Sequence, residues 1–145
     1  MIVFRMHNPR YAAFDTAGAA MYGGRWHSRG IHVVYTAEHA SLAVLEAVIH
    51  ASGEEVPARS ITRIRIPDDL AIEAAPWKEF PQSQLFGDQW VREARSAVLR
   101  VESVVVNRLE SNFVLNPRHA DFSRIRRDRA IPFSFDPRFF GPAVT

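Results

Sequence analysis

One stretch of the chain changes from one hydrophobic period to another. Over 31–36, apolar and polar positions alternate, so that Val33 and Tyr35 share one face of a predicted strand. Over 37–51, apolar positions recur every three or four residues, which predicts a helix with Thr36 as its N-cap. The sequence therefore predicts a strand that leads directly into an amphipathic helix.

The remaining pattern predicts short strands and one further helix. The strands are predicted at 2–6, 60–66, 98–106, 112–115 and 131–135. The second helix is expected at 89–97 with Asp88 as its N-cap, and Ser52-Gly53 is expected to end the first helix. Residues 68–84 contain two prolines and are expected to form an irregular surface segment. Strands that do not alternate regularly with helices predict an α+β fold in one compact domain, residues 1–145.

The composition is that of a globular protein without disulfides. Hydrophobic residues occupy 47% of the 145 positions, enough to build a core and too many for wholesale disorder. The absence of cysteine excludes disulfides, thiolate catalysis and cysteine-ligated zinc. The chain shows neither a signal peptide nor an apolar run of membrane-spanning length, so we expect a soluble cytoplasmic protein without membrane contact.

The charge pattern favours some binding partners over others. The net charge is only +2, and Lys78 is the sole lysine, with no Gly-rich loop before it, which excludes a P-loop nucleotide site. The cluster at 124–129 contains four arginines, but it is interrupted by Asp128 and has no interleaved aromatic residue. A solvated face or a protein-docking patch is therefore favoured, and no direct nucleic-acid binding is expected.

Two charged residues accompany the predicted strand and helix. Arg25 follows the permissive turn Gly23-Gly24 and presents a planar cation suited to phosphate or carboxylate. Glu46 lies on the apolar side of the predicted helix, where an unpaired carboxylate is costly to bury. Glu46 is either a boundary or structurally paired residue, or a pocket carboxylate that faces Arg25 and Tyr35. The residues alone leave both interpretations open.

Three further residues carry two interpretations each. Tyr35 on a strand is usually a core residue whose hydroxyl is bonded at an edge, and a lone Ser103 by default interrupts a strand. Arg5 is either a second phosphate ligand or one half of a salt bridge. Glu46 and His50 are four residues apart, but no carboxylate–histidine set at ligand spacing accompanies them, so no metal is expected.

Seven short motifs, taken together, resemble one bacterial protein family. In order they are Gly23-Gly24-Arg25-Trp26, Val34-Tyr35-Thr36, Ala43-Val44-Leu45-Glu46, Gly87-Asp88-Gln89-Trp90, Val101-Glu102-Ser103-Val104, Asn112-Phe113-Val114-Leu115-Asn116-Pro117-Arg118-His119 and Phe135-Asp136-Pro137-Arg138. Each motif is weak alone. Their order and spacing over nearly the full length resemble the RES-domain proteins, toxins of bacterial toxin–antitoxin pairs named for an arginine, a glutamate and a serine.

The resemblance implies a fold similar to that of ADP-ribosyltransferase toxins, with central mixed or antiparallel strands and flanking helices. It also implies chemistry directed at NAD+. Some family members degrade NAD+ by hydrolysis or phosphorolysis, and others transfer ADP-ribose to a protein. NAD+ would then be the substrate, and no separate cofactor is expected. A second hypothesis, of a different class, is a non-catalytic module that binds nucleotide or nucleic acid.

By motif position, the resemblance implies a role for each candidate, with Glu46, Arg25 and Tyr35 as the catalytic residues. Arg25 would clamp a phosphate of NAD+ through paired N–H groups, and Arg5 would be a second ligand. Tyr35 would offer its ring face to nicotinamide. Glu46 would hold a ribose hydroxyl and face the positive charge of an oxocarbenium-like transition state. Ser103 would orient a ribose or phosphate, and without an evident general base it is not expected to be a nucleophile.

Two residues depart from the family pattern. His27 stands where asparagine is usual, which alters a local hydrogen bond. Glu102 replaces the proline that usually precedes the serine. Proline would stiffen the approach to Ser103, and an added carboxylate is expected to repel the phosphates of the substrate.

The resemblance also implies protein partners. A toxin must be silenced, so we expect an antitoxin with a helix-turn-helix (Xre-type) DNA-binding part, whose tail would obstruct the pocket. Such toxins can also pair as homodimers. The sequence itself locates neither contact.

Overall fold

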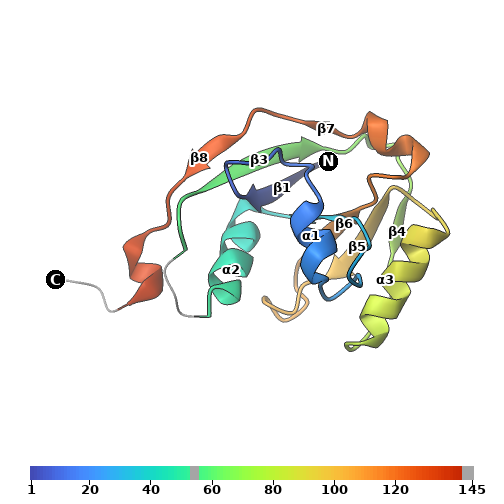
Figure 1. Cartoon of the computed structure of the whole chain (residues 1–145), viewed down its shortest axis with the longest axis horizontal. Helices are drawn as coiled ribbons and strands as arrows, with labels where there is room; N and C mark the ends of the chain where they lie inside the picture. The colour runs from blue at the N-terminus through green and yellow to red at the C-terminus, as the bar shows by residue number, and fades with distance from the viewer. Residues whose placement is uncertain (53–55, 142–145) are drawn as a thin grey trace.

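The computed structural model describes residues 1–52 and 56–141, and its centre is one mixed β-sheet (Figure 1). The strands are β1 (Ile2–His7), β2 (Val34–Ala37), β3 (Arg59–Arg65), β4 (Ile72–Ala74), β5 (Val98–Glu102), β6 (Ser111–Leu115), β7 (Arg126–Arg127) and β8 (Ile131–Phe133). The helices are α1 (Ala17–Tyr22), α2 (Ala40–His50) and α3 (Gln82–Arg92), with short 3-10 helices at Ala120–Arg124 and Pro137–Phe140. Figure 1 shows the three α-helices toward one side of the molecule and β3, β7 and β8 along the opposite edge.

The sheet runs in the order β4-β5-β6-β2-β1-β3-β7, and β8 also pairs with β3. Neighbouring strands are antiparallel except β4 and β5, which are parallel. β1 pairs with β3 over its whole length, from Ile2 opposite Arg65 to His7 opposite Ser60. A mixed sheet with a few flanking helices confirms the predicted α+β class.

Side chains on both faces of the central strands are buried. Successive residues of a strand point to opposite faces, and the adjacent residues Val98 and Leu99 belong to two different apolar clusters. The first cluster includes Val3, Val34, Ile64, Ile66, Val98 and Leu115. The second includes Trp26, Val33, Trp90, Leu99, Val101 and Val114. The sheet is therefore covered on both faces, and the second cluster includes the loop tryptophan that follows Arg25.

The first predicted unit is present, but both of its elements start later than predicted. The predicted N-cap Thr36 is wrong, because Thr36 lies inside β2 and its hydroxyl donates a hydrogen bond of 2.8 Å to the Phe113 carbonyl of β6. β2 ends at Ala37, and the actual N-cap of α2 is His39, which has an extended backbone and a side chain that makes no capping hydrogen bond. The predicted helix end at Ser52-Gly53 falls partly outside the described residues, which omit Gly53.

The second predicted helix is misplaced by several residues. α3 begins at Gln82, inside the stretch expected to be irregular, and its N-cap is Pro81 instead of Asp88. Proline is tolerated at a helix start because the first N–H groups of a helix have no intrahelical partner. Asp88 is buried within the helix, where a contact across the fold holds its carboxylate. The expected irregular stretch also contains β4, which adds the parallel pair.

The other predicted strands are present, and two of them end earlier than predicted. β1, β3 and β6 confirm the strands predicted at 2–6, 60–66 and 112–115. β5 ends at Glu102 and β8 at Phe133, so the predicted extensions beyond them are wrong. The chain leaves the sheet in the loop 103–110, where Asn107 and Arg108 adopt positive φ angles of 55° and 65°. Within the described ranges, no helix is long and apolar enough to cross a membrane.

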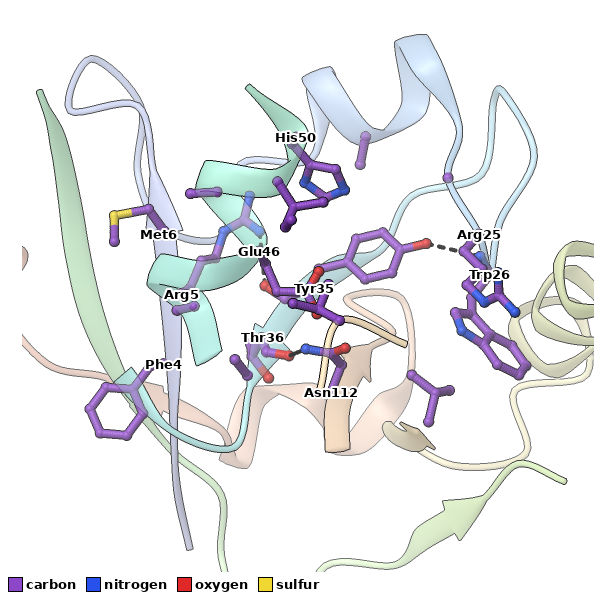
Figure 2. Close-up of a pocket in the computed structure, with 18 of the residues that line it drawn as sticks. Phe4, Arg5, Met6, Arg25, Trp26, Tyr35, Thr36, Glu46, His50 and Asn112 are labelled. Atoms are coloured by element: carbon purple, nitrogen blue, oxygen red, sulfur yellow. Dashed lines mark hydrogen bonds between the residues drawn. The ribbon is translucent and has the colours of Figure 1, made fainter. Parts of the chain in front are cut away.

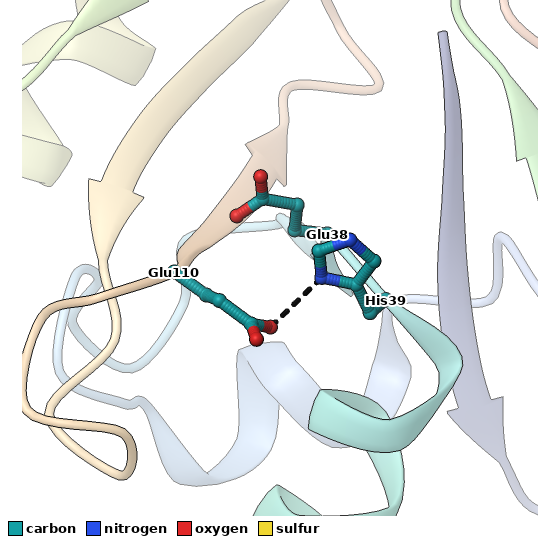
Figure 3. Close-up of side chains that lie close together, drawn as sticks. All are labelled: Glu38, His39 and Glu110. Atoms are coloured by element: carbon teal, nitrogen blue, oxygen red, sulfur yellow. Dashed lines mark hydrogen bonds and ion pairs between the residues drawn. The ribbon is translucent and has the colours of Figure 1, made fainter.

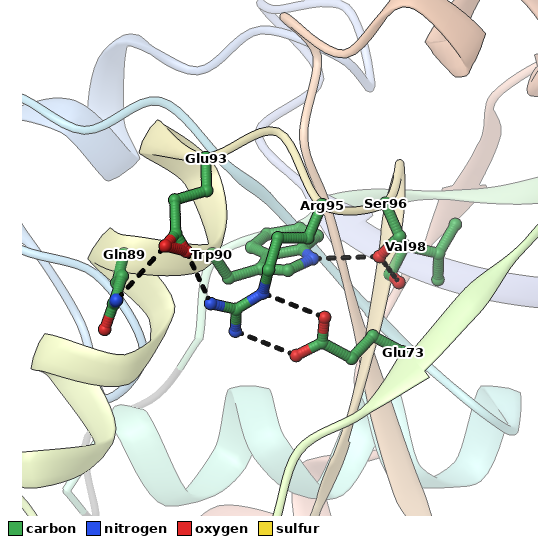
Figure 4. A network of polar contacts seen from close by, with 7 residues as sticks. All are labelled: Glu73, Gln89, Trp90, Glu93, Arg95, Ser96 and Val98. Atoms are coloured by element: carbon green, nitrogen blue, oxygen red, sulfur yellow. Dashed lines mark hydrogen bonds and ion pairs between the residues drawn. The ribbon is translucent and has the colours of Figure 1, made fainter.

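A polar network fixes the C-terminal end of α3 to β4 and β5 (Figure 4). Arg95 donates hydrogen bonds of 3.0 and 2.9 Å to the Glu73 carboxylate of β4. The buried Trp90 indole donates 2.9 Å to the hydroxyl of Ser96, which itself donates 2.7 Å to the Val98 carbonyl of β5. Because the indole N–H of Trp90 is satisfied, its burial carries no desolvation penalty from an orphaned donor. α3 is therefore a firm support for the loop that packs against it.

Candidate active site

A cavity of about 780 Å³ opens beside the sheet (Figure 2), within the volume range of small-molecule sites. Its walls come from β1, β2, α2, the loop at 23–27 and the segments next to β3 and β5. Four of the five predicted site residues line it, namely Arg5, Arg25, Tyr35 and Glu46. The two arginines and the carboxylate therefore share one cavity and do not open onto separate surfaces.

The loop that carries Arg25 is clamped by side chains of α3. The Ser83 hydroxyl donates a hydrogen bond of 2.7 Å to the Arg25 carbonyl. The Gln84 amide donates to the carbonyls of Gly24 and His27, at 3.1 and 3.0 Å. Three loop carbonyls are thus held by one helix, so the backbone that positions Arg25 is fixed on both sides of that residue.

Two further residues of α3 hold the same loop. Gly87 packs so tightly against Trp26 that an added Cβ atom would lie 1.7 Å from the Trp26 carbonyl oxygen, and only glycine allows this approach. The Asp88 carboxylate accepts a hydrogen bond of 2.7 Å from the Ser28 N–H and another from the Ser28 hydroxyl. The carboxylate of Asp88 therefore binds the backbone N–H of Ser28 in the loop, and it does not cap the N-terminus of α3.

The guanidinium of Arg25 is held by neutral groups. One Nη donates 3.2 Å to the Lys78 carbonyl, and the guanidinium carbon lies 5.0 Å from the centre of the Trp77 ring. Its Nε is buried and has no hydrogen-bond partner among the described residues. No carboxylate in that part of the chain, Glu46 included, lies within ion-pair distance of Arg25.

Arg5 has a similar environment at another wall of the cavity. Its Nη1 donates 3.0 Å to the Tyr35 carbonyl, and its Nε is likewise buried without a partner in the described chain. Burial lowers the pKa of Arg5 to about 10, partly offset by Asp15, so the side chain stays cationic at neutral pH. No salt bridge to Arg5 occurs within the described residues, so that alternative gains no support from the structure.

The hydroxyl of Tyr35 is held by two contacts with the loop that follows Arg25. Its oxygen lies 2.7 Å from Nδ1 of His27 and accepts a hydrogen bond of 3.2 Å from the Trp26 N–H (Figure 2). Burial raises the pKa of the Tyr35 hydroxyl well above its ordinary value, so the ring is neutral at any physiological pH. Tyr35 therefore presents an uncharged aromatic side chain to the cavity.

Ser103 lies behind Glu46 and is not one of the residues that line the cavity. Its hydroxyl, almost fully buried, donates a hydrogen bond of 2.9 Å to Oε1 of Glu46. This bond fixes one carboxylate oxygen and leaves the other lone pairs of Glu46 for a ligand. The structure therefore shows a contact of Ser103 with Glu46, and the direct contact of Ser103 with a substrate stays a prediction.

The unusual Glu102 does line the cavity, but its charge is matched. Its carboxylate accepts hydrogen bonds of 3.1 and 3.3 Å from Arg108, and the Arg108 guanidinium stacks 4.3 Å from the centre of the Trp77 ring. Trp77 also contacts the guanidinium of Arg25. This pairing reduces the repulsion of phosphates that the sequence predicts for Glu102.

Sequence reasoning missed four contributors to the site. Arg59 lines the cavity from the start of β3, and the alternation of its strand gave no signal for this position. Asp88 and Ser83 act on the loop through contacts about 60 residues apart in the chain, which no local pattern predicts. His27, noted only as a departure from a motif, turns out to contact Tyr35.

The described residues contain one group with ligand atoms close enough for a metal ion, at Glu38, His39 and Glu110 (Figure 3). None of these three residues lines the cavity. Hydrogen bonds within the protein explain why their side chains lie close together. Glu38 accepts 2.7 Å from the Ser111 N–H, and His39 contacts Glu110 at 2.9 Å. The hydrogen bond to Glu110 raises the pKa of His39. The group ties the start of α2 to β6.

The arginine cluster at 124–129 lies away from the cavity, in β7 and its flanks. Arg124 pairs with Asp69 at 2.6 Å, and Asp128 binds Arg65 through two contacts of 2.8 Å. These arginines are exposed to solvent. The arrangement favours the solvated or docking face over part of the candidate site.

Comparison with known proteins identifies similar chains. The model of the RES domain matches residues 2–136. A "Prs ADP-ribosylating toxin" of Sphingobium sp. (strain YBL2) is 34% identical, over 88% of this chain and 86% of its own length. A "Toxin Res" of Photorhabdus laumondii is also 34% identical, over 95% and 96%. A chain of the M. tuberculosis MbcT–MbcA toxin–antitoxin complex has the same fold, with a TM-score of 0.77 at 14% identity over 92% of this chain and 84% of that one.

Proposed function

The chain belongs to the RES-domain family, and on that premise we propose that it is the toxin of a toxin–antitoxin pair that consumes NAD+. The proposed reaction cleaves the bond between nicotinamide and ribose. The observation that carries the proposal is the meeting, in one cavity of about 780 Å³, of Glu46 with Arg5 and Arg25, two arginines whose buried Nε atoms have no partner in the described chain.

The unpartnered arginines favour a ligand with negative charge. A buried N–H without a partner is costly, so it favours an acceptor supplied from outside the chain. Guanidinium groups match phosphate oxygens with paired N–H donors. We assign Arg25, and Arg5 as a second ligand, to the pyrophosphate of NAD+.

Glu46 supplies the group that the bond cleavage needs. As the ribose–nicotinamide bond breaks, its electron pair leaves on nicotinamide, which departs neutral, and positive charge develops on the ribose. A carboxylate fixed beside that charge stabilises it electrostatically without reorganising. The hydrogen bond from Ser103 holds one oxygen of Glu46 in place, so we assign Ser103 to positioning and Glu46 to the ribose.

Tyr35 suits the neutral aromatic part of the substrate. Its ring is uncharged and fixed by two contacts at its hydroxyl, and a stacked aromatic pair contributes about 0.5–1.5 kcal/mol beyond area burial. We therefore assign Tyr35 to nicotinamide.

The acceptor of the ADP-ribosyl group is water, phosphate or a protein. In each case an oxygen or nitrogen of the acceptor forms the new bond to the ribose and gives up a proton. Transfer to a protein is the second candidate reaction, favoured by the similarity to a relative whose name describes ADP-ribosylation. Analysis of the product distinguishes free ADP-ribose, its phosphorylated form and a modified protein band.

The reaction is tested by mixing the purified protein with NAD+ and measuring free nicotinamide. We expect release by the wild type and a loss of roughly 10²–10³-fold in Glu46→Gln, the size seen when one preorganised transition-state contact is removed. Glu79→Gln is the matched control, because Glu79 is exposed and does not line the cavity. Full release by Glu46→Gln would show that Glu46 has been misassigned.

A non-catalytic module that binds nucleotide or nucleic acid is the competing hypothesis of another class. It predicts no nicotinamide from the wild type and, for nucleic acid, binding that weakens steeply with salt. The exposed arginines of the β7 edge would then be the contact.

The proposal also includes an antitoxin partner, since the structural neighbour was solved as a toxin–antitoxin complex. We expect expression of the chain alone to inhibit growth and co-expression of a neighbouring helix-turn-helix protein to restore it. Equal growth under both conditions would argue against the toxin assignment.

A further inference from the structure

We propose that His27 is a positioning residue that sets the orientation of Tyr35 in the cavity. The inference rests on the proposed function, in which Tyr35 contacts the nicotinamide of NAD+. It concerns one of the two positions at which the sequence departs from the family pattern described above.

The hydrogen bonds of His27 fix its tautomer. The imidazole is almost fully buried, with Nε2 at 2.7 Å from the Ala19 carbonyl of α1 and Nδ1 at 2.7 Å from the Tyr35 oxygen. A carbonyl can only accept, so Nε2 carries the proton and Nδ1 of the neutral ring is left as an acceptor. The Tyr35 hydroxyl must therefore donate to His27.

Two further contacts restrict the position of the Tyr35 hydroxyl. The Trp26 N–H donates 3.2 Å to the same Tyr35 oxygen, so both the donor and one acceptor position of the hydroxyl are used. Gly24 closes the space, because an added Cβ atom would lie 2.9 Å from the Tyr35 oxygen and 3.0 Å from Cε1 of His27. Loss of the hydrogen bond from Tyr35 to His27 is therefore expected to change the orientation of the Tyr35 ring.

The position of Tyr35 also reaches the anion end of the cavity. Its backbone carbonyl accepts the hydrogen bond of 3.0 Å from Arg5, one of the two arginines with a buried, unpartnered Nε. His27 therefore contacts the hydroxyl of Tyr35, and the backbone carbonyl of the same Tyr35 binds Arg5. A histidine links α1 to both proposed subsites.

Asparagine, the usual residue of the motif, does not replace both contacts. In imidazole, Nε2 lies one bond farther from Cβ than Nδ1 does, whereas both polar atoms of the asparagine amide lie only as far out as Nδ1. We expect the amide introduced by His27→Asn to keep at most one of the bonds to Ala19 and Tyr35.

The test is a double-mutant cycle between His27→Asn and Tyr35→Phe, with nicotinamide release as the readout. If His27 acts through the Tyr35 hydroxyl, His27→Asn lowers kcat about tenfold in the wild type, the change expected from losing one buried hydrogen bond, with KM changed far less. In the Tyr35→Phe background, the same substitution costs less than about twofold. Equal losses in both backgrounds would overturn the proposal, because His27 would then act by general support of the fold.

His32→Asn is the matched control. His32 bonds the hydroxyl of Thr16, next to α1, at 2.8 Å, but it does not line the cavity. We expect it to leave kcat unchanged and to show no coupling with Tyr35→Phe. A coupling as large as that of His27 would contradict the assignment.

A second readout separates this inference from the proposed function. Nitrogen NMR of the imidazole is expected to show the proton of His27 on Nε2 and to show a shift of Nδ1 in the Tyr35→Phe variant. A proton on Nδ1, or no response to that substitution, overturns the positioning role whether or not NAD+ is cleaved. The expected spectrum without nicotinamide release would leave the contact correct and the NAD+ assignment wrong.

Discussion

The arginines of this protein occupy two regions that differ in what surrounds the charge. Along the β3–β7 edge they are exposed, and Arg65 forms two contacts of 2.8 Å with the carboxylate of Asp128. In the cavity, Arg5 and Arg25 bond only backbone carbonyls, and each keeps a buried Nε without a partner in the described chain. The edge has the higher density of positive charge, but the cavity has the unmet hydrogen-bonding capacity.

The property that marks a candidate site is the surroundings of the guanidinium and not its charge. An exposed guanidinium is solvated and gains little from an ion pair, so nothing at the edge requires a ligand. A buried donor without a partner costs free energy of folding, and a bound ligand that accepts its hydrogen bond removes that cost. Burial with a missing partner, and not charge density, therefore separates the candidate site from the rest of the surface.

The strongest prediction concerns the contact between α3 and the loop that carries Arg25. Gly87→Ala would place a methyl group against the Trp26 carbonyl, 1.7 Å away, and we expect a loss of roughly 3 kcal/mol in the free energy of unfolding, measured by urea denaturation. Gly18→Ala in α1 is the control, since a Cβ there meets nothing within 4 Å and should be neutral or slightly stabilising. Equal stability of the two variants would contradict the clamp.

The next effect compares one arginine from each region. Arg25→Lys keeps the charge but removes the planar fork, and we expect the Kd for NAD+ to rise about tenfold or more, by the roughly 1.5–3 kcal/mol typical of charge-assisted bonds. The affinity is measured by calorimetry in the Glu46→Gln background, in which turnover is slowed. Arg126→Lys at the exposed edge should change Kd by less than about twofold. Similar losses from both substitutions would remove the distinction between the regions.

A smaller effect concerns His7, whose imidazole is influenced by one arginine of each region, Arg5 and Arg127. Burial lowers the pKa of His7 below its ordinary 6.5, and the charges of Arg5 and Arg127 lower it further. The unfolded chain then takes up a proton near pH 6.5 that the fold accepts only at lower pH, so stability falls as pH drops below about 6.5. His39, whose pKa is raised by Glu110, has the opposite slope.

The measurement is urea denaturation between about pH 7.5 and pH 5 in a His39→Gln background, which removes that opposing slope. We expect Arg127→Gln to make the fall shallower, because one of the charges that disfavour protonation of His7 is gone. Stability that rises toward the acid end of this range in the His39→Gln protein would contradict the assignment.

The smallest effect is expected at the edge itself. Arg65→Gln removes both contacts to Asp128, but the pair is exposed, so we expect no measurable change in nicotinamide release or in the denaturation midpoint at about 0.15 M salt. A clear loss of activity would place function on the β3–β7 edge and undo the comparison.

Much of the sheet was predictable because its strands carry a strong local signal. β1, β3 and β6 follow from alternation and from the prolines and asparagine that end them, and four of the five predicted site residues line one cavity. Ser103 was placed in the right neighbourhood with a different contact, since only the structure shows it bonded to Glu46. Sequence spacing gives the neighbourhood of a side chain but not its direction.

The errors arise where a tertiary contact decides a local choice. Asp88 has the residue type of an N-cap, but its carboxylate caps Ser28 from inside α3. Gly87 has the type of a helix breaker, but it is the contact that lets α3 touch the loop at Trp26. Thr36 resembles an N-cap, but it bonds Phe113 across the sheet. Each contact partner lies far away in the sequence, so the local pattern of residues cannot predict the contact.

A crystal structure of the Glu46→Gln protein soaked with NAD+ would show whether the cavity is the NAD+ site. We expect the dinucleotide in the cavity, with pyrophosphate oxygens at hydrogen-bond distance from Arg25 or Arg5 and the nicotinamide ribose beside residue 46. NAD+ bound at the 124–129 edge, or an empty cavity at millimolar NAD+, would contradict it.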